Sequence, residues 1–281
     1  MSGTVEKTER RTEREASRDE PRASTPARVD VLGVGLSAID IPVAIRAIGQ
    51  WIDRREPHFV TVSGVHGVME SVRDESLRRI HNRAGLVTPD GMPMVWLARA
   101  AGHRQVTRVY GPDLMLETCR VSVERGWKHY FYGGNVGVAD ELKQALQAKF
   151  PGLQVVGTEC PPFRPLTADE DADVCRRIAD SGADIVWVGL STPKQERWMD
   201  AHVGRIGAPV AIGVGAAFDF HTGRVKQAPR WMQRNGLEWL FRLIQEPKRL
   251  WKRYLTNNPA FVAALLLRRL GLRKYGSIDD R

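Results

Sequence analysis

Three short stretches place polar side chains directly after apolar runs of the kind that form strands. These side chains are the carboxylic acid Asp90 in LVTPDGMPMVW, the amide Gln195 in GLSTPKQER and the carboxylic acid Asp219 in GVGAAFDF. Ligands of open α/β sheets bind at the carboxyl ends of the strands. A carboxylate there can act as a general base if its pKa is raised, and an amide can bond to a sugar hydroxyl or a uracil edge.

Each of these side chains also has a structural interpretation. Asp90 and Asp219 can cap the helices that follow them. Lys194 and Glu196, on either side of Gln195, can both be structural. A lone histidine such as His66, in SGVHGVME, is more often packed than catalytic, so its role is left open.

A glycine-rich turn lies in FYGGNVGVADEL, between an expected strand and an expected helix. Glycines there let backbone amides approach a phosphate, and the helix N-terminus favours an anion. The spacing matches neither GxGxxG nor GxxxxGK[ST]. The turn therefore predicts either a phosphate contact or merely a tight βα connection.

Short apolar runs alternate with segments of helical period from Val29 onward, which predicts βα units and a mostly parallel sheet with helices on both faces. Strands are expected over residues 31–36, 59–62, 85–87, 129–132, 153–157, 185–189 and 210–214. Helices are expected over residues 43–54, 70–83, 92–101, 114–125 and 138–149.

The chain divides by composition into three parts. Residues 1–28 mix charge with Ser, Thr and Pro and lack an apolar stretch, so we expect a disordered tail without a signal peptide, and a cytoplasmic protein. Residues 29–223 form the expected catalytic domain. Residues 224–281 form a basic helical appendage, in which Pro247 and Pro259 are expected to separate three short helices.

Charge is concentrated at the C-terminal end. Residues 221–281 carry fourteen basic and four acidic residues, a net +10 within a chain of net charge +9. A segment with this excess of positive charge is expected to bind a polyanion, either nucleic acid or an anionic membrane surface. Tryptophan and leucine alternate with the charges there, which favours a membrane surface, and no run is long enough to span a bilayer.

Neither a disulfide framework nor a metal site is expected. The three cysteines, Cys119, Cys160 and Cys175, are far apart and odd in number. The histidines, cysteines and acids show no convincing ligand spacing. The sequence therefore predicts reduced thiols and no metal.

Five blocks change this interpretation when they are taken together: LVTPDGMPMVW, RVYGPDLM, FYGGNVGVADEL, VGLSTPKQERWM and GVGAAFDFHTGRVKQAPRWMQRNGLEWLFRLIQEPKRLWKR. In this order and spacing they resemble the WecG/TagA/CpsF family of bacterial glycosyltransferases over residues 29–254. The resemblance implies a Rossmann-like, metal-independent, inverting enzyme. Its substrates would be a UDP-sugar donor and a polyprenyl-diphosphate-linked saccharide acceptor at the cytoplasmic membrane face, in cell-envelope or exopolysaccharide synthesis. Donors in the family carry N-acetylmannosamine, its uronic acid or glucose.

The resemblance also implies roles for particular residues. Asp90 matches the catalytic base, with Thr61, Arg108 and Gln195 beside it, and Asp219 matches a nucleotide contact. The appendage arginines thought to engage the lipid diphosphate and close the site match Arg242 and Arg249. The other expected substrate-binding residues are Ser63, Gly133, Gly134, Asn135, Gly189 and Ser191.

Two departures from the family pattern leave the donor and acceptor open. Ser63 stands where the family commonly has asparagine, and Pro161, Pro162 and Phe163 stand where it commonly has Gly-Tyr-Phe. Two other functions are also considered. One is nucleic-acid binding through the basic segment, and the other is a nicotinamide-dependent oxidoreductase, which would be expected to show GxGxxG.

Overall fold

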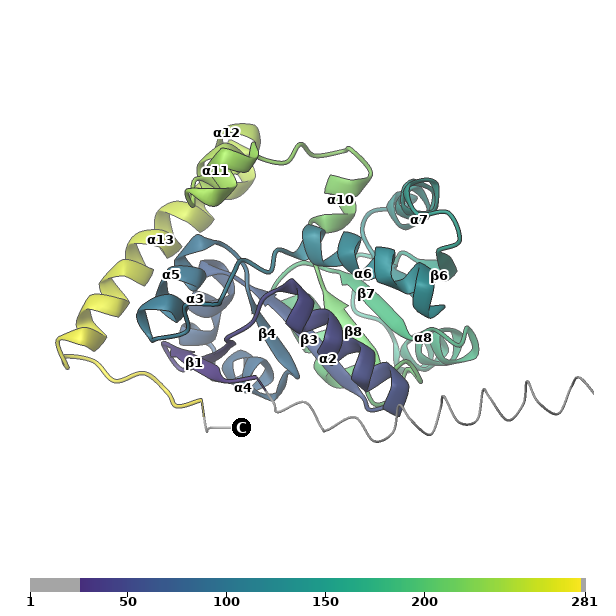
Figure 1. Ribbon diagram of the computed structural model, residues 1–281, viewed down its shortest axis with the longest axis horizontal. Coiled ribbons are helices and arrows are strands. Elements are labelled where there is room, and N and C mark those ends of the chain that lie inside the picture. Colours follow the sequence, from purple (N-terminus) through teal and green to yellow (C-terminus); the bar gives the residue numbers. More distant parts are fainter. Residues whose placement is uncertain (1–25, 279–281) are drawn as a thin grey trace, which may run out of the picture.

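A six-stranded parallel sheet forms the centre of the computed structural model, which describes residues 26–278 (Figure 1). The predicted tail, residues 1–28, falls almost wholly outside the described residues. The strand order is β4-β3-β8-β7-β5-β6, and every neighbouring pair is parallel. The strands are β3 (His58–Ser63), β4 (Leu86–Pro89), β5 (Lys128–Gly133), β6 (Gln154–Glu159), β7 (Ile185–Gly189) and β8 (Val210–Gly213).

Helices cover both faces of the sheet, which confirms the predicted α/β class (Figure 1). One core lies under α2 (Ile41–Arg54), α6 (Gly111–Arg125), α7 (Val138–Lys149) and α10 (Ala217–His221). The other lies under α3 (Val65–Arg73), α4 (Glu75–Arg83), α5 (Met92–Ala100), α8 (Ala168–Asp180) and α9 (Lys194–His202).

Alternate side chains of the central strands enter opposite cores. In β7, Trp187 packs in the α2–α6–α7 core, whereas Val186 and Val188 pack in the other. Both faces are therefore apolar, as expected for a sheet covered on two sides. This is why the strands appear in the sequence as continuous apolar runs.

The expected strand over residues 31–36 is wrong. The segment is an antiparallel hairpin of β1 (Arg28–Val31) and β2 (Val34–Ser37). Leu32 and Gly33 form its turn with φ of 55° and 90°. Positive φ at both turn positions suits a two-residue hairpin, but it is normally signalled by Asn-Gly. Leu32 is fully buried, so core packing holds a conformation that its residue type does not favour.

The expected helix over residues 70–83 is also wrong, because the chain breaks at Asp74. Asp74 adopts an extended conformation, and its carboxylate accepts a hydrogen bond from Leu77 N at 3.2 Å. It therefore ends α3 and caps α4. The break lets α3 begin earlier, at Val65, directly after β3.

The C-terminal segment forms α11 (Arg230–Arg234), α12 (Glu238–Gln245) and α13 (Pro247–Arg269). Pro259 lies inside α13, so the prediction that it separates two helices is wrong. Proline removes one backbone hydrogen bond, to the carbonyl of Leu255. Both Pro259 and Leu255 are exposed, so water can bond to that carbonyl.

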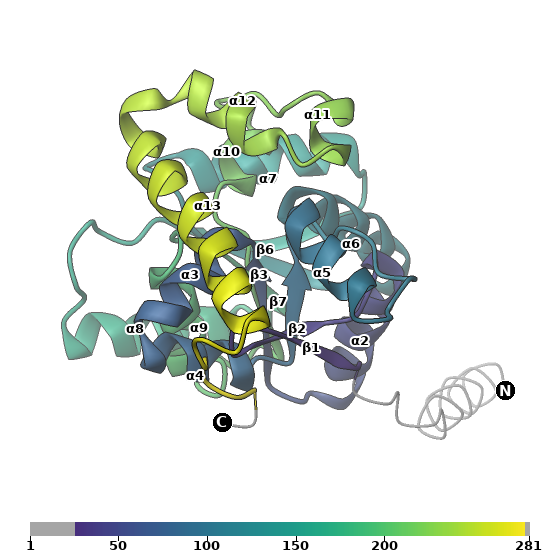
Figure 2. The ribbon, with the colours of Figure 1, turned by 90° about the vertical axis from the view of Figure 1, so that its left-hand side faces the viewer.

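The long helix α13 runs alongside α3, and α11 and α12 lie over the carboxyl ends of the strands (Figures 1 and 2). Phe261 and Ala264 of α13 are buried in the same core as α3. The appendage therefore packs directly on the sheet domain. Within residues 26–278, no helix combines the length and apolarity needed to cross a membrane.

Candidate active site

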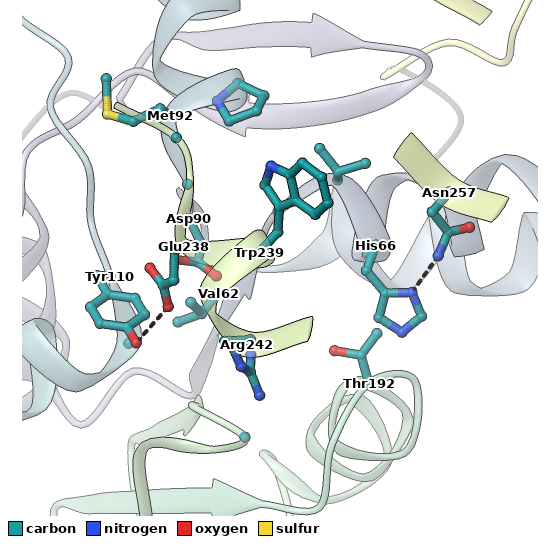
Figure 3. A pocket seen from close by; sticks show the side chains of 18 of the residues that line it. Val62, His66, Asp90, Met92, Tyr110, Thr192, Glu238, Trp239, Arg242 and Asn257 are labelled. Carbon is teal, nitrogen blue, oxygen red and sulfur yellow. Dashed lines mark hydrogen bonds between the residues drawn. The ribbon is translucent and has the colours of Figure 1, made fainter. Parts of the chain in front are cut away.

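A cleft of about 750 Å³ opens at the carboxyl ends of the strands, beneath α12 and α13 (Figure 3). Its floor comes from the segments that follow β3, β4, β7 and β8, and its roof comes from α12 and α13. Six of the residues predicted from the sequence line it. They are Asp90, Arg108, Ser191, Gln195, Arg242 and Arg249.

Asp90 follows β4 directly, and its backbone N–H donates to Ser63 O of β3 at 3.1 Å. The N-cap of α5 is Gly91, without a side-chain hydrogen bond, so Asp90 does not cap that helix. About 30% of its side chain is exposed, while Oδ1 is buried without a hydrogen-bond partner among the described residues. Burial raises the pKa of Asp90 to about 6, and the Glu238 carboxylate adds to this, although Arg108 and Arg242 oppose it. A carboxylate with a pKa close to neutrality suits a general base.

Arg108 joins Asp90 to α12. Its guanidinium lies 3.6 Å from Asp90 Oδ1 and donates to Glu238 Oε2 and, at 3.2 Å, to Gln233 Oε1. It also lies 3.9 Å over the ring of Tyr110, whose hydroxyl donates to Glu238 Oε1 at 2.8 Å. Glu238 therefore links α12 to Arg108 and Tyr110, and Figure 3 shows its contact with Tyr110 beside Asp90.

Three arginines of α12 and α13 line the cleft. Arg242 lies 5.6 Å over the ring of Phe220, and its buried Nε has no hydrogen-bond partner among the described residues. Arg249 pairs with Glu246 at 2.5 Å. Burial, together with the charges of Arg242 and Arg249, lowers the pKa of Arg253. Clustered guanidiniums of this kind suit a diphosphate.

Asp219 lies beside this cluster, in the first turn of α10 and not at a strand end. It precedes Phe220, which lines the cleft. Burial raises the pKa of Asp219 even though Arg249, Arg224 and Arg242 oppose the shift. Asp219 itself does not line the cleft, but its carboxylate lies within the field of the arginines.

Gln195 is 3% exposed on the cleft floor, and most of its amide is engaged within the protein. Oε1 accepts from Gly215 N at 3.0 Å, and Nε2 donates to Glu196 Oε1 at 3.1 Å. Glu196 is fully buried and also accepts from Thr192 Oγ1 at 2.8 Å, so it holds the loop. Gln195 thus fixes two loops of the floor and can offer a substrate its second amide hydrogen.

Thr61 and Ser63 lie outside the cleft wall. Both are buried in β3, at 0% and 1% exposure, and Ser63 Oγ donates to Thr61 Oγ1 at 3.4 Å. In this structure, they can influence a substrate only through the residues above them.

The glycine turn is also outside the cleft lining. Gly134 N donates to Gly189 O at 3.0 Å, so this amide is already engaged. A Cβ on Gly133, whose φ is 123°, would lie 2.7 Å from Gly189 C. Asn135 is exposed. Close packing of β5 on β7 thus accounts for Gly133 without a phosphate.

His66 joins α3 to α13 on the other side of the cleft (Figure 3). Asn257 Nδ2 donates to His66 Nδ1 at 3.0 Å, and Asn257 Oδ1 accepts from Arg73 at 2.7 Å. Burial lowers the pKa of His66 to about 4, so the ring is neutral at pH 7. His66 therefore helps to hold α13 in place.

Several lining residues were not predicted from the sequence. Arg253 follows Arg249 by four residues, so the helical period already places both on one face of α13. Glu238, Tyr110 and Gln233 carry no such signal, because they act through contacts between distant segments. The missed polar residues include Tyr110, Gln233, Glu238, Arg253, Tyr254, Asn257 and Asn258.

Among the described residues, one group could hold a metal ion: Asp171, Cys175 and His202. None of the three lines the cleft. The Asp171 carboxylate already contacts His202 Nε2 at 2.6 Å and Arg205 at 2.7 Å. The Arg205 guanidinium supplies the positive charge that a metal would bring. The cluster of Asp171, Cys175 and His202 therefore stabilises the contact between α8 and α9.

Comparison with known proteins gives a match to one family over almost all of the described chain. Residues 29–275 match the family described as "Glycosyl transferase WecG/TagA/CpsF family". A Bacillus subtilis (strain 168) protein named "N-acetylglucosaminyldiphosphoundecaprenol N-acetyl-beta-D-mannosaminyltransferase" is 28% identical over 225 residues, covering 77% of this chain and 86% of that protein. A Bacillus spizizenii (strain ATCC 23059 / NRRL B-14472 / W23) protein of the same name is 27% identical over 216 residues, covering 77% and 81%.

Proposed function

Because the chain belongs to the WecG/TagA/CpsF family of glycosyltransferases, we propose that it moves a sugar from a UDP-sugar to a polyprenyl-diphosphate-linked saccharide. The names of the two relatives support N-acetylglucosamine on the lipid diphosphate as the acceptor and N-acetylmannosamine as the transferred sugar. The observation that carries the proposal is Asp90, a carboxylate of raised pKa in a cleft that also holds three arginines of α12 and α13. The product would belong to cell-envelope or exopolysaccharide synthesis.

Asp90 would accept the proton of the attacking acceptor hydroxyl. The hydroxyl oxygen forms a bond to the anomeric carbon from the face opposite UDP, the bond to the UDP oxygen breaks, and the configuration inverts. Positive charge must then stabilise the departing diphosphate. Arg242 would supply this charge without a metal, and Asp219, which precedes the lining residue Phe220, would contact the nucleoside.

The appendage would also hold the enzyme against the inner face of the cell membrane. Exposed apolar side chains on α12 and α13, including Ile244, Trp251 and Leu255, alternate with arginine and lysine. Such a surface suits anionic lipid headgroups above an apolar boundary. Peripheral binding would bring the cleft to its lipid-linked acceptor.

The family match favours a glycosyltransferase over the two other functions considered, nucleic-acid binding and nicotinamide-dependent oxidation. Ligand-induced thermal shifts test the choice directly. UDP is expected to raise the unfolding temperature, while NAD leaves it unchanged. Retention on DNA at moderate salt, without binding to anionic vesicles, would instead support the nucleic-acid alternative.

The decisive experiment offers the enzyme several donors and acceptors. UDP-N-acetylmannosamine, its uronic acid and UDP-glucose are each incubated with short-chain polyprenyl-diphosphate N-acetylglucosamine, and the product mass is measured. One donor is expected to add a single sugar and release UDP, with the anomeric configuration inverted. Absence of transfer from every UDP-sugar to every lipid-linked acceptor would overturn the proposal.

The pH profile tests how Glu238 affects Asp90. The wild-type kcat/KM is expected to fall as the pH drops through about 6, because the base must be ionised and the pKa of Asp90 lies there. Glu238→Gln removes a nearby negative charge that favours the protonated form of Asp90. The acid limb should therefore move to lower pH. An unshifted limb would show that Glu238 does not influence the base.

Glu117→Gln provides the matched control for this profile. Glu117 pairs with Arg120 on the surface of α6, and neither residue lines the cleft. The substitution makes the same change in net charge, so its acid limb should coincide with that of the wild type.

A further inference from the structure

The cleft continues beyond the arginines as a groove between α5 and α13. Both helices border the same side of the molecule (Figures 1 and 2). We call this the α5–α13 groove, and its walls are Trp96, Leu97, Ala100, Phe261, Val262 and Leu265.

The groove has a different chemical character from the rest of the cleft. Arg253 is the last charged residue of α13 that lines the cavity, and Leu265 lies twelve residues, or about 18 Å, further along the helix. Among the described lining residues, α5 contributes no charge either. The site is therefore cationic at one end and apolar at the other.

The apolar end is open to solvent. Trp96 is 51% exposed on one wall, and Val262 is 57% exposed on the other. An apolar groove that opens from a binding cleft favours an apolar ligand, because water is then displaced from both surfaces. The occupant must also carry an anion, since the groove begins at the arginines.

We propose that the α5–α13 groove binds the first isoprene units of the lipid acceptor while Arg249 and Arg253, on the same helix α13, hold its diphosphate. This inference rests on the function proposed above and adds a subsite for the hydrocarbon. The two ends of the site match the two ends of such a ligand in charge and polarity. The rest of the polyprenyl chain would pass from the open groove into the membrane.

The test varies the tail of the acceptor and keeps its saccharide and diphosphate fixed. Acceptors with a methyl tail and with increasing numbers of isoprene units are compared below their micelle concentrations. The wild-type KM is expected to fall at least tenfold over the first few units and then level off, with kcat little changed. A KM that does not depend on the tail would overturn the proposal that the groove binds isoprene units, while leaving the transferase function intact. Absence of transfer to any acceptor would instead count against the function itself.

Two substitutions on α13 separate the groove from general attraction to lipid. Val262→Glu puts a charge on the groove wall, and Leu266→Glu puts the same charge one turn further on, at an exposed position outside the cleft lining. Val262→Glu should abolish the fall in KM with tail length, whereas Leu266→Glu should preserve it. Equal losses in both variants would overturn the proposal.

Ala100→Glu repeats the test from the opposite wall. Ala100 is exposed at the end of α5, so a larger side chain there need not disturb the core. Thermal unfolding checks that each variant is folded. Retention of the full tail dependence in folded Ala100→Glu and Val262→Glu would contradict the proposal.

Discussion

Asp90→Asn is expected to reduce kcat by about two to four orders of magnitude, the usual contribution of a general base. Asparagine keeps the size and polarity of the side chain, but its amide cannot accept the proton of the attacking hydroxyl. Binding of UDP should change little, because the arginine cluster is untouched. Steady-state kinetics on the best donor and acceptor, with UDP affinity measured by titration, would check both statements. Near-wild-type turnover would exclude Asp90 as the base.

The same substitution should stabilise the fold, which separates loss of chemistry from loss of structure. A pKa raised from 3.8 to about 6 corresponds to a penalty of about 3 kcal/mol above pH 6, where folded Asp90 is ionised. The penalty disappears as the pH falls below the unfolded pKa. Asp90→Asn should therefore raise the free energy of unfolding near neutral pH. This increase over the wild type should become progressively smaller as the pH is lowered. Asp173→Asn, at an exposed ion pair on α8, should not show this pattern.

Apolar patterning predicted the elements that build the sheet. β7 matched its expected range and β3 differed by one residue at each end, because strands buried on both faces must be apolar throughout. The errors arose where tertiary contacts override local preference. The Leu32 turn is held by the core, and α13 continues through Pro259 to Phe261 and Ala264, which pack in the core.

The candidate site was predictable where a residue follows a strand and carries its own chemistry. Asp90 and Gln195 are of this kind, since a parallel sheet gathers the ends of its strands at one edge. Glu238 was not predictable, because its contacts with Arg108 and Tyr110 span more than a hundred residues of sequence. Only the folded chain shows that α12 completes the surroundings of the base.

The cationic roof of the cleft is where the second large effect is expected. Arg242 comes from α12 and lies over Phe220, and its buried Nε has no hydrogen-bond partner in the part of the chain that the structure describes. It also opposes the rise in the pKa of Asp90, so its charge reaches the base. A guanidinium that is held in place before the reaction can stabilise negative charge developing on the leaving diphosphate without reorganising.

Arg242→Ala is therefore expected to reduce kcat/KM by about 10²–10³-fold, the range seen when one preorganised donor to a developing anion is removed. Arg242→Lys should recover only part of this loss, because an ammonium keeps the charge without the two-pronged geometry. Lys252→Ala is the matched control, since it removes an exposed positive charge of α13 that does not line the cleft. Kinetics with saturating acceptor and varied UDP-sugar measure the effect. Equal losses in Arg242→Ala and Lys252→Ala would mean that the appendage acts only through its overall charge at the membrane, and not through a guanidinium placed at the leaving group.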